Sequence, residues 1–592
     1  MIMKRIYLVS AVMLLTAAVS FGQNFNPTVE VTNTYQGNAS EVHKPSIEMN
    51  VPDSLLRFDL DFDYEVFEKP YQGAYSFKPY MLNMRPEKDA WRGRSLYLKA
   101  GAGYTLHPRL DFVFSPEQKG AFQMSVYANH RSYFGDYHGV GTEMGDGFYR
   151  MTKSGGGFAG HDILTSAGFD GRYNWDKAIL SFGVGYYGVA AKDTVVSRSY
   201  NALDFNARIR SNTASERYFL YDVAFRGRVA NDKLDYKGFS FPDGKTVDGQ
   251  NESWFTIDGL AGPVFGGGRS LLVGFECETA SYSRFYDGNI GRIALVPSYR
   301  LKSGRWNLNL GVRFEFMFRN EASDTLCFRN MSGGDGQIIY PEAHVAFAAG
   351  KSVELYADAT GGSRLNTYSS QVEKCHHLNP SFLLSANSGV LTPLIDNTVE
   401  RVNAKVGVRG GANSVFRFDV NGGIGMYGYA LMESALFTAE GDLVPSLAYS
   451  DVNLIYANVL LGLRLRRFSM DADFRYRSVT FPGKDVLNLG FKLPAYSGGL
   501  RMRYDINSRL YAGISAEASS WREGNCASLA SLDIATVRIP GYVDLGLNCG
   551  YRFNRKLELW LDSGNLLCQT VRRNPFYAEK GPWVTAGLTL NL

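Results

Sequence analysis

A long alternation of apolar and polar side chains is the feature that most constrains how this chain can fold. Between Arg305 and Phe318, large apolar residues take every second position, and two arginines and a glutamate stand between them. Successive side chains of a β-strand point to opposite faces of a sheet, so this period of two predicts a strand. The run is about twice the usual strand of five or six residues, and it is long enough to cross hydrocarbon at a tilt of about 45°. We therefore predict one strand of a transmembrane barrel, with its apolar face toward lipid.

The same pattern recurs from residue 95 to the C-terminus, and it predicts about 22 strands. Turn-forming sequences rich in Gly, Asn, Ser and Lys follow the even-numbered strands, at 117–120, 266–269, 302–305, 349–352, 411–414, 506–509 and 553–556. Most odd-numbered strands are followed by longer connections, at 134–161, 191–201, 230–253, 319–337, 365–398, 431–451, 522–541 and 567–582. The predicted fold class is all-β: a transmembrane antiparallel β-barrel over 95–592, with short periplasmic turns and long extracellular loops.

Composition agrees with a barrel. The chain has 592 residues, which exceeds the size of an ordinary single core, whereas a closed barrel wraps a lumen and escapes that limit. It contains 63 Gly, 36 Tyr and 38 Phe, residues that suit bends, turns and aromatic girdles. The net charge of +4 is too small to indicate a nucleic-acid partner.

Two segments precede the predicted barrel. Residues 1–22 have the charges, the short apolar run and the small residues of an export signal peptide, so we expect an outer-membrane location. Residues 23–94 are rich in Pro, Asn and acidic residues. We expect them to form a periplasmic N-terminal segment, either a reduced plug or a docking arm.

The strand number, the turn–loop alternation and the terminal strand over 95–592 resemble the barrel of TonB-dependent receptors. Thr28, Val29, Glu30, Val31 and Thr32 are similar to the short box with which those receptors bind their energy-coupling protein. The resemblance implies import of a scarce solute through a plugged lumen, with a TonB-type protein as partner. Two departures stand against it: residues 23–94 are shorter than a receptor plug, and the last residue is Leu592 where many such barrels end in an aromatic.

The polar faces of several predicted strands carry charges of both signs. We expect these side chains to face the lumen: Arg313, Glu315, Arg464, Arg466, Asp471, Asp473, Arg475 and Arg477. They are explained either by a charged path for a solute or by a paired network that braces a wide barrel, and the second explanation is favoured.

No motif predicts catalysis, a cofactor or a resident metal. Adjacent residues do not easily aim two imidazoles at one ion, so we expect Cys375, His376 and His377 to lie in a solvated outer loop. His130 and His161 fall on neighbouring strands, but the sequence has no nucleophile elbow. An enzyme is therefore not predicted.

Three functions remain open. The first is an outer-membrane receptor and transport barrel that takes up an unknown solute through a gated or plugged lumen. The second is a non-transporting scaffold that binds envelope lipoproteins, and the third is a passive porin. In each case outer-membrane lipid surrounds the barrel.

Overall fold

The computed structural model describes residues 95–592, apart from 105, 117–119, 146–147, 193–195, 213–217, 237–248, 285–286, 322–337, 378–382, 385–390, 393–394, 412–414, 438–442, 483–489, 529–533 and 574–580. The predicted signal peptide, the segment 23–94 and the box at Thr28–Thr32 lie outside the described residues. Within the described part, no helix is long and apolar enough to span a bilayer.

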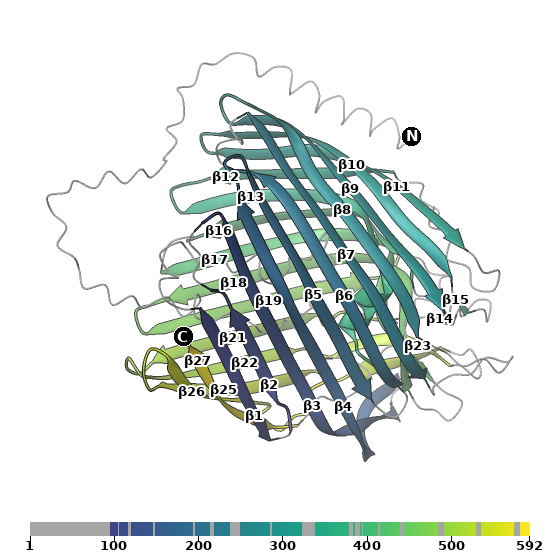
Figure 1. Cartoon of the computed structure of the whole chain (residues 1–592). Coiled ribbons are helices and arrows are strands. Elements are labelled where there is room, and N and C mark those ends of the chain that lie inside the picture. The colour runs from purple at the N-terminus through teal and green to yellow at the C-terminus, as the bar shows by residue number, and fades with distance from the viewer. Residues whose placement is uncertain are drawn as a thin grey trace.

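The fold is a closed antiparallel barrel of 22 strands, as the sequence predicted (Figure 1). Its strands are β1 (Leu96–Tyr104), β2 (Arg109–Phe114), β3 (Phe122–Gly145), β4 (Phe148–Asn174), β5 (Ala178–Lys192), β6 (Val196–Ser211), β7 (Phe219–Tyr236), β8 (Gln250–Phe265), β9 (Arg269–Arg284), β10 (Gly288–Ser303), β11 (Trp306–Glu321), β12 (Ile339–Ala348), β13 (Val353–Leu365), β16 (Asn397–Gly410), β17 (Phe416–Phe437), β18 (Leu443–Arg464), β19 (Phe468–Thr480), β21 (Tyr496–Asp505), β22 (Leu510–Ser519), β25 (Tyr542–Arg552), β26 (Leu557–Gly564) and β27 (Trp583–Asn591).

The last strand closes the ring against the first. Residues of β27 pair antiparallel with β1 from Tyr97 opposite Asn591 to Tyr104 opposite Val584. The Leu96 N–H donates to the Leu592 carbonyl at 2.9 Å, and the Leu592 N–H donates back at 2.8 Å. Closure leaves no free sheet edge, which hydrocarbon could not hydrogen-bond.

Short pieces outside the ring lie among the longer connections. They are the helix α3 (Tyr368–Lys374) and the strands β14 (Leu383–Leu384), β15 (Leu391–Thr392), β20 (Gly490–Phe491), β23 (Arg522–Ser528) and β24 (Ile534–Ile539). We call the end of the barrel with these connections the loop end, and the opposite end the turn end. The predicted tight turns at 266–269, 302–305, 349–352, 506–509 and 553–556 fall at the turn end.

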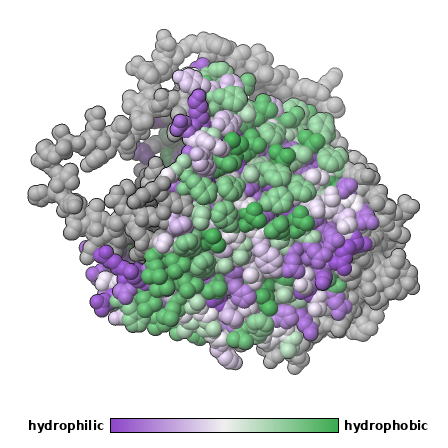
Figure 2. Space-filling view, in the orientation of Figure 1, coloured by the Kyte–Doolittle hydropathy of each residue, from purple (hydrophilic) through white to green (hydrophobic). Residues whose placement is uncertain are grey.

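Toward the turn end, the two faces of the strands match the predicted alternation. On β11, Trp306, Leu310, Val312, Phe316 and Phe318 are 40–54% exposed. Arg313 and Glu315, on the opposite face, are only 8% and 3% exposed. Figure 2 shows the outward apolar side chains as a broad green belt over the strands.

Toward the loop end of β5–β10, the polarity of the two faces inverts. On β6, Leu203 is exposed outward, but the next outward positions are Asn201 and Ser199. The inward positions there become apolar, and Tyr200 and Ala202 are 1% and 3% exposed. Polar and apolar side chains still alternate, but here the apolar ones point inward and the polar ones point outward. This part of the wall therefore lies beyond the hydrocarbon.

The inversion explains where the predicted strand ends were wrong. Residues 134–161 were assigned to a loop, yet β3 and β4 pair through most of that range, from Phe134 opposite His161 to Gly145 opposite Phe148. β7 likewise extends to Tyr236, and β17 and β18 pair as far as Phe437 opposite Leu443. Backbone pairing continues beyond the lipid, where the strands need no apolar face. The hydropathy pattern therefore underestimates the length of these strands.

The inner wall is braced by aromatic side chains that lie flat over glycines. The Tyr356 hydroxyl on β13 reaches across Gly407 of β16 and donates to Asp419 of β17 at 2.7 Å. At the closing seam, the Trp560 ring of β26 covers Gly587 of β27 and Gly101 of β1. A Cβ on any of these glycines would penetrate the ring that covers it, so each wide side chain needs a glycine beneath it.

Candidate functional site: a segment folded into the loop end

The first part of the connection between β13 and β16 folds into the barrel instead of lying outside it. We call residues 365–377 the inserted segment; it contains α3 and ends on Cys375, His376 and His377. Tyr368 and Val372 are fully buried, and His377 is 1% exposed. Thr367 caps α3 by accepting the Ser370 N–H at 3.3 Å. The expectation of a solvated loop for Cys375–His377 is therefore wrong.

A buried ion pair fixes the middle of the inserted segment. Arg198 of β6 donates to Asp232 of β7 at 3.0 Å, and both side chains are 0% exposed. The Tyr368 hydroxyl donates to the same carboxylate at 2.6 Å. Burial raises the pKa of Tyr368 well above its ordinary value, so its hydroxyl stays a neutral donor.

Three further residues tie the inserted segment to one side of the ring. Glu373 forms an ion pair with Arg228 of β7. The Ser369 hydroxyl donates to Glu252 of β8 at 2.7 Å. His376 Nδ1 lies 2.6 Å from Asp162 of β4, and the His376 carbonyl accepts from Arg198. The Nδ1 contact holds the His376 imidazole, and the contact from Arg198 holds the backbone at this position.

Contacts at the start of the segment reach the other side of the ring. Just before the segment, at the end of β13, the Ser363 N–H donates to Glu315 of β11 at 2.8 Å. Asn366 donates to the Tyr449 hydroxyl of β18 at 3.3 Å and to Thr398 at 3.0 Å. The segment therefore crosses the lumen from β4 to β18.

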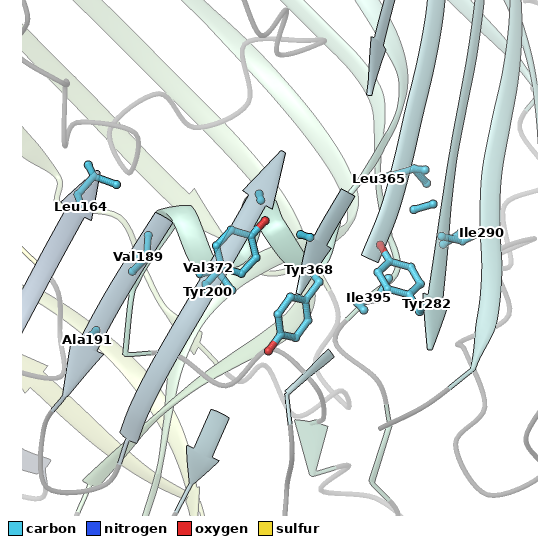
Figure 3. Close-up of a cluster of buried hydrophobic side chains, with 13 residues drawn as sticks. Leu164, Val189, Ala191, Tyr200, Tyr282, Ile290, Leu365, Tyr368, Val372 and Ile395 are labelled. Atoms are coloured by element: carbon cyan, nitrogen blue, oxygen red, sulfur yellow. The ribbon is translucent and has the colours of Figure 1, made fainter. Parts of the chain in front are cut away.

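Apolar packing supports these polar contacts (Figure 3). Leu365, Tyr368, Val372 and Ile395 pack on the inward apolar side chains where the wall polarity has inverted. The wall contributes Leu164, Val189, Ala191, Tyr200, Ala202, Ala230, Ala280, Tyr282 and Ile290. Four of these are alanines, whose small size leaves room for the inserted side chains.

A second element crosses the barrel mouth. We call the hairpin of β23 and β24 the strap. Its β23 pairs with β17 at Leu436 and Phe437, and its β24 pairs with β4 at Tyr149 and Arg150. Ten strands separate β4 from β17 in either direction around the ring, so the strap joins opposite sides of the barrel.

The strap and the inserted segment share one buried cluster. Cys526 of β23 and Cys375 of the segment pack with Met151, Ala435, Leu447, Phe491, Val537 and Ile539. Both cysteines are reduced thiols. Burial raises the pKa of the Cys526 thiol to about 12, so this side chain acts as a small apolar residue.

Two titratable groups lie beside this cluster. Arg522 at the start of the strap donates to Glu433 of β17 at 2.9 Å. Burial and the nearby Arg364 lower the pKa of Lys374 to about 7, against the opposing effect of Glu433 and Glu373. The charge of Lys374 is therefore sensitive to pH near neutrality.

The predicted charged residues fall into two groups. Arg313 and Glu315 belong to a buried network in which Arg313 binds Glu276 at 2.8 and 2.9 Å, and Arg292 binds Glu278 at 2.7 Å. Arg464 donates to Asp471 at 2.8 Å near the turn end, where both side chains are 40–47% exposed.

The remaining predicted positions lie on or beside β19. Asp473 pairs with Arg475 at 3.3 Å, and Arg477 is 4% exposed. β18 ends at Arg464, so Arg466 lies in the exposed turn that follows rather than on a strand face. The structure thus pairs Arg464 with Asp471 across β18 and β19, and Asp473 with Arg475 within β19, but it does not bring all eight residues together.

The residues that sequence reasoning missed are those of the inserted segment. Leu365, Tyr368 and Val372 are spaced three and four residues apart, which is the period of an amphipathic helix. Thr367 stands just before them as an N-cap. That short signal was present in the predicted loop, but nothing in it identifies the opposing wall.

Two observations concern metal binding and the two histidines of β3 and β4. Among the residues that the structure describes, no group of three or more His, Cys, Asp and Glu side chains could hold a metal ion. His130 contacts Thr165 at 2.8 Å, whereas the His161 ring lies 6.2 Å from that of Phe134. These two histidines therefore have separate local partners.

Comparison with known proteins decides the fold family. No protein-family model matches the sequence, and no curated protein matches it significantly. The siderophore receptor PirA from Acinetobacter baumannii is similar in structure, with a TM-score of 0.57 and 11% identity over 84% of this chain and 80% of that one. This chain has the fold of a TonB-dependent receptor barrel.

Two more structures share that receptor fold. FpvA of P. aeruginosa, bound to heterologous pyoverdines, gives a TM-score of 0.60 and 12% identity over 84% of this chain and 72% of that one. The copper transporter OprC gives 0.57 and 13% identity, with 84% and 80% covered. The similar structures are named for different ligands, siderophores in two cases and copper in the third. The likeness therefore shows the fold of the barrel alone.

Proposed function

We propose that this chain is an outer-membrane receptor and transport barrel that takes up a polar solute through its lumen. One observation carries the proposal: a wide barrel with a charged inner wall is crossed at its loop end by its own inserted segment and strap. A barrel of about 22 strands needs such obstruction if it is not to leak. The similar siderophore and copper proteins support a transport role.

The inner charges divide between two proposed roles. Arg464 and Asp471 face the water-filled turn end and are proposed to contact passing solute. Arg313 and Glu315 are held by several partners and are proposed to brace the wall. The remaining residues, Asp473, Arg475 and Arg477, are proposed to extend the exposed pair along β19, with Arg466 at the entrance of the turn end.

The decisive experiment measures conductance in planar bilayers. We compare the intact barrel with a variant in which residues 366–396 are replaced by a Gly–Ser linker. The proposal expects low conductance from the intact barrel and a large increase from the variant. High conductance in the intact protein would instead indicate a passive porin, and low conductance in both would favour the scaffold.

Energy coupling requires a separate test. We propose that Thr28–Thr32 bind a TonB-type protein and that residues 23–94 act as a reduced plug or a docking arm. Deletion of 28–32 is expected to abolish solute accumulation in cells without changing conductance in bilayers. Deletion of 23–94 is expected to raise conductance if the segment is a plug, and to release a co-purifying envelope lipoprotein if it is a docking arm.

A further inference from the structure

The outward face of β5–β10, at the loop end, carries a patch of polar side chains, most of them Asn and Ser. Asn201, Asn231 and Asn251 stand opposite one another on β6, β7 and β8, and Ser283 continues the row on β9. The neighbouring outward positions complete the patch: Lys192, Ser197, Ser199, Lys233, Asp235, Ser253, Ser281 and Asn289. We call these twelve residues the Asn–Ser patch.

The patch directly adjoins the apolar belt. Leu203 and Val229 lie one outward step from Asn201 and Asn231, and they are 50% and 46% exposed. Figure 2 shows hydrophilic side chains gathered beside the green belt on this wall. Because hydrocarbon covers the belt, the layer next to the patch is that of the lipid headgroups.

The side chains of the patch form a flat array of paired donors and acceptors. Tyr186 donates to Asn201 at 2.7 Å, and Asn231 donates to Asn251 at 2.5 Å. Asn251 donates onward to Ser283 at 3.5 Å. Amides and hydroxyls both donate and accept, and strands about 4.8 Å apart present them at a regular spacing. Such an array is complementary to sugar hydroxyls.

The composition of the patch argues against two other occupants. It has two lysines and one aspartate, far fewer cations than the basic clusters that hold lipid phosphates. Apart from Tyr186 at its border, it lacks the aromatic, Met and Arg side chains that are enriched at the centre of protein interfaces.

We propose that the Asn–Ser patch binds the sugar part of the glycolipid in the outer leaflet. The proposal rests on the outer-membrane location that the proposed function requires. The flat sheet would order the oligosaccharides that lie beside β5–β9, through hydrogen bonds to the row of three asparagines.

The test compares the intact protein with the triple variant Asn201→Ala, Asn231→Ala and Asn251→Ala. Each is placed in nanodiscs of phosphatidylethanolamine and phosphatidylglycerol that contain either purified lipopolysaccharide or lipid A without sugars. Native mass spectrometry counts the glycolipid molecules retained per barrel. A control variant carries Lys302→Ala, Ser303→Ala and Arg305→Ala at the turn end, and heat-modifiable gel migration verifies folding of all three proteins.

We expect the triple variant to retain lipopolysaccharide about tenfold more weakly, because several hydrogen bonds are lost together. Retention of lipid A should be the same in all three proteins. Equal lipopolysaccharide retention by the variant would overturn the proposal, as would equal retention of lipid A and lipopolysaccharide by the intact barrel. If the triple variant fails to fold, Asn251→Ala with Ser283→Ala is measured in the same way.

The two proposals fail in different ways. A barrel that gates conductance but shows no sugar preference contradicts only the glycolipid site. A barrel that prefers the sugar-bearing glycolipid but never conducts contradicts only transport.

Discussion

Single residues in this barrel differ sharply in how much they contribute to the free energy of unfolding. Trp560 lies across β27 and β1, which meet at the closing seam, and only glycine fits beneath its ring. Asp232 accepts from two groups in a fully buried position, whereas Asp471 pairs with Arg464 at a position where both side chains are 40–47% exposed. Burial, rather than the presence of an ion pair, sets the cost of a substitution.

Gly587→Ala should destabilise the barrel by about 1–3 kcal/mol, since the added methyl overlaps Trp560 and the Ala100 carbonyl. The temperature at which the folded band is lost on a semi-native gel measures the change. Gly581→Ala is the matched control, because nothing lies within 4 Å of its added Cβ. Equal thermal stability of the two variants would contradict the role assigned to the seam.

Asp232→Asn should release the inserted segment at a cost of about 3–5 kcal/mol, because it leaves Arg198 buried without a counter-charge. Asp471→Asn, at an exposed ion pair, should cost less than about 1 kcal/mol. Thermal unfolding and the conductance of both variants test the contrast. The reverse order of effects would show that the inserted segment is not held at Asp232.

At the scale of elements, the inserted segment and the strap are attached in different ways. Buried ion pairs and an apolar cluster hold the inserted segment. The strap is joined to β4 and to β17 by two paired positions each, and it is also held by the cluster around Cys375 and Cys526 and by the Arg522–Glu433 ion pair. Because its backbone pairings to the ring are so few, we expect the strap to open at lower free energy than the strands of the ring.

Arg538→Ala should loosen the strap. The Arg538 guanidinium stacks 4.0 Å from the Phe148 ring centre and 4.4 Å from that of Trp521, and two such contacts contribute about 1–2 kcal/mol. Limited proteolysis should cut the strap roughly tenfold faster, with the barrel left intact. Arg509→Ala at the turn end provides the control, and unchanged cleavage of Arg538→Ala would refute the weak attachment.

At the scale of the whole molecule, closure of the mouth should depend on pH through Lys374. Its pKa is about 7 in the folded protein and about 10.5 in an open, hydrated state. The open state therefore binds more protons between these values, and closure becomes more favourable as pH rises from 7 toward 10.5.

Conductance fluctuations recorded from pH 6 to pH 9 should therefore decrease at the alkaline end. Lys374→Met removes the titrating group and should flatten this dependence, while Lys556→Met at the turn end should leave it unchanged. A pH dependence that persists in Lys374→Met would assign the effect to another group.

The alternation of apolar and polar side chains in the sequence determined much of the fold by itself. The two faces of Trp306–Phe318, the tight turns and the even strand number all follow from the period of two and from turn chemistry, which are local properties. The exposure of Phe316 and the burial of Glu315 on the finished barrel agree with that local pattern.

Only the tertiary structure decided what closes the barrel. The inserted segment buries Leu365, Tyr368 and Val372 because the facing strands point alanines and other apolar side chains inward. Those facing residues come from strands far away in the sequence. Most of residues 134–161 likewise continue as strands because β3 and β4 pair with each other there. This pairing lies beyond the height at which lipid requires an outward apolar face. The period of two in the sequence reflects the environment, lipid or water, on each face of a strand. Contacts between distant segments depend instead on how the ring closes.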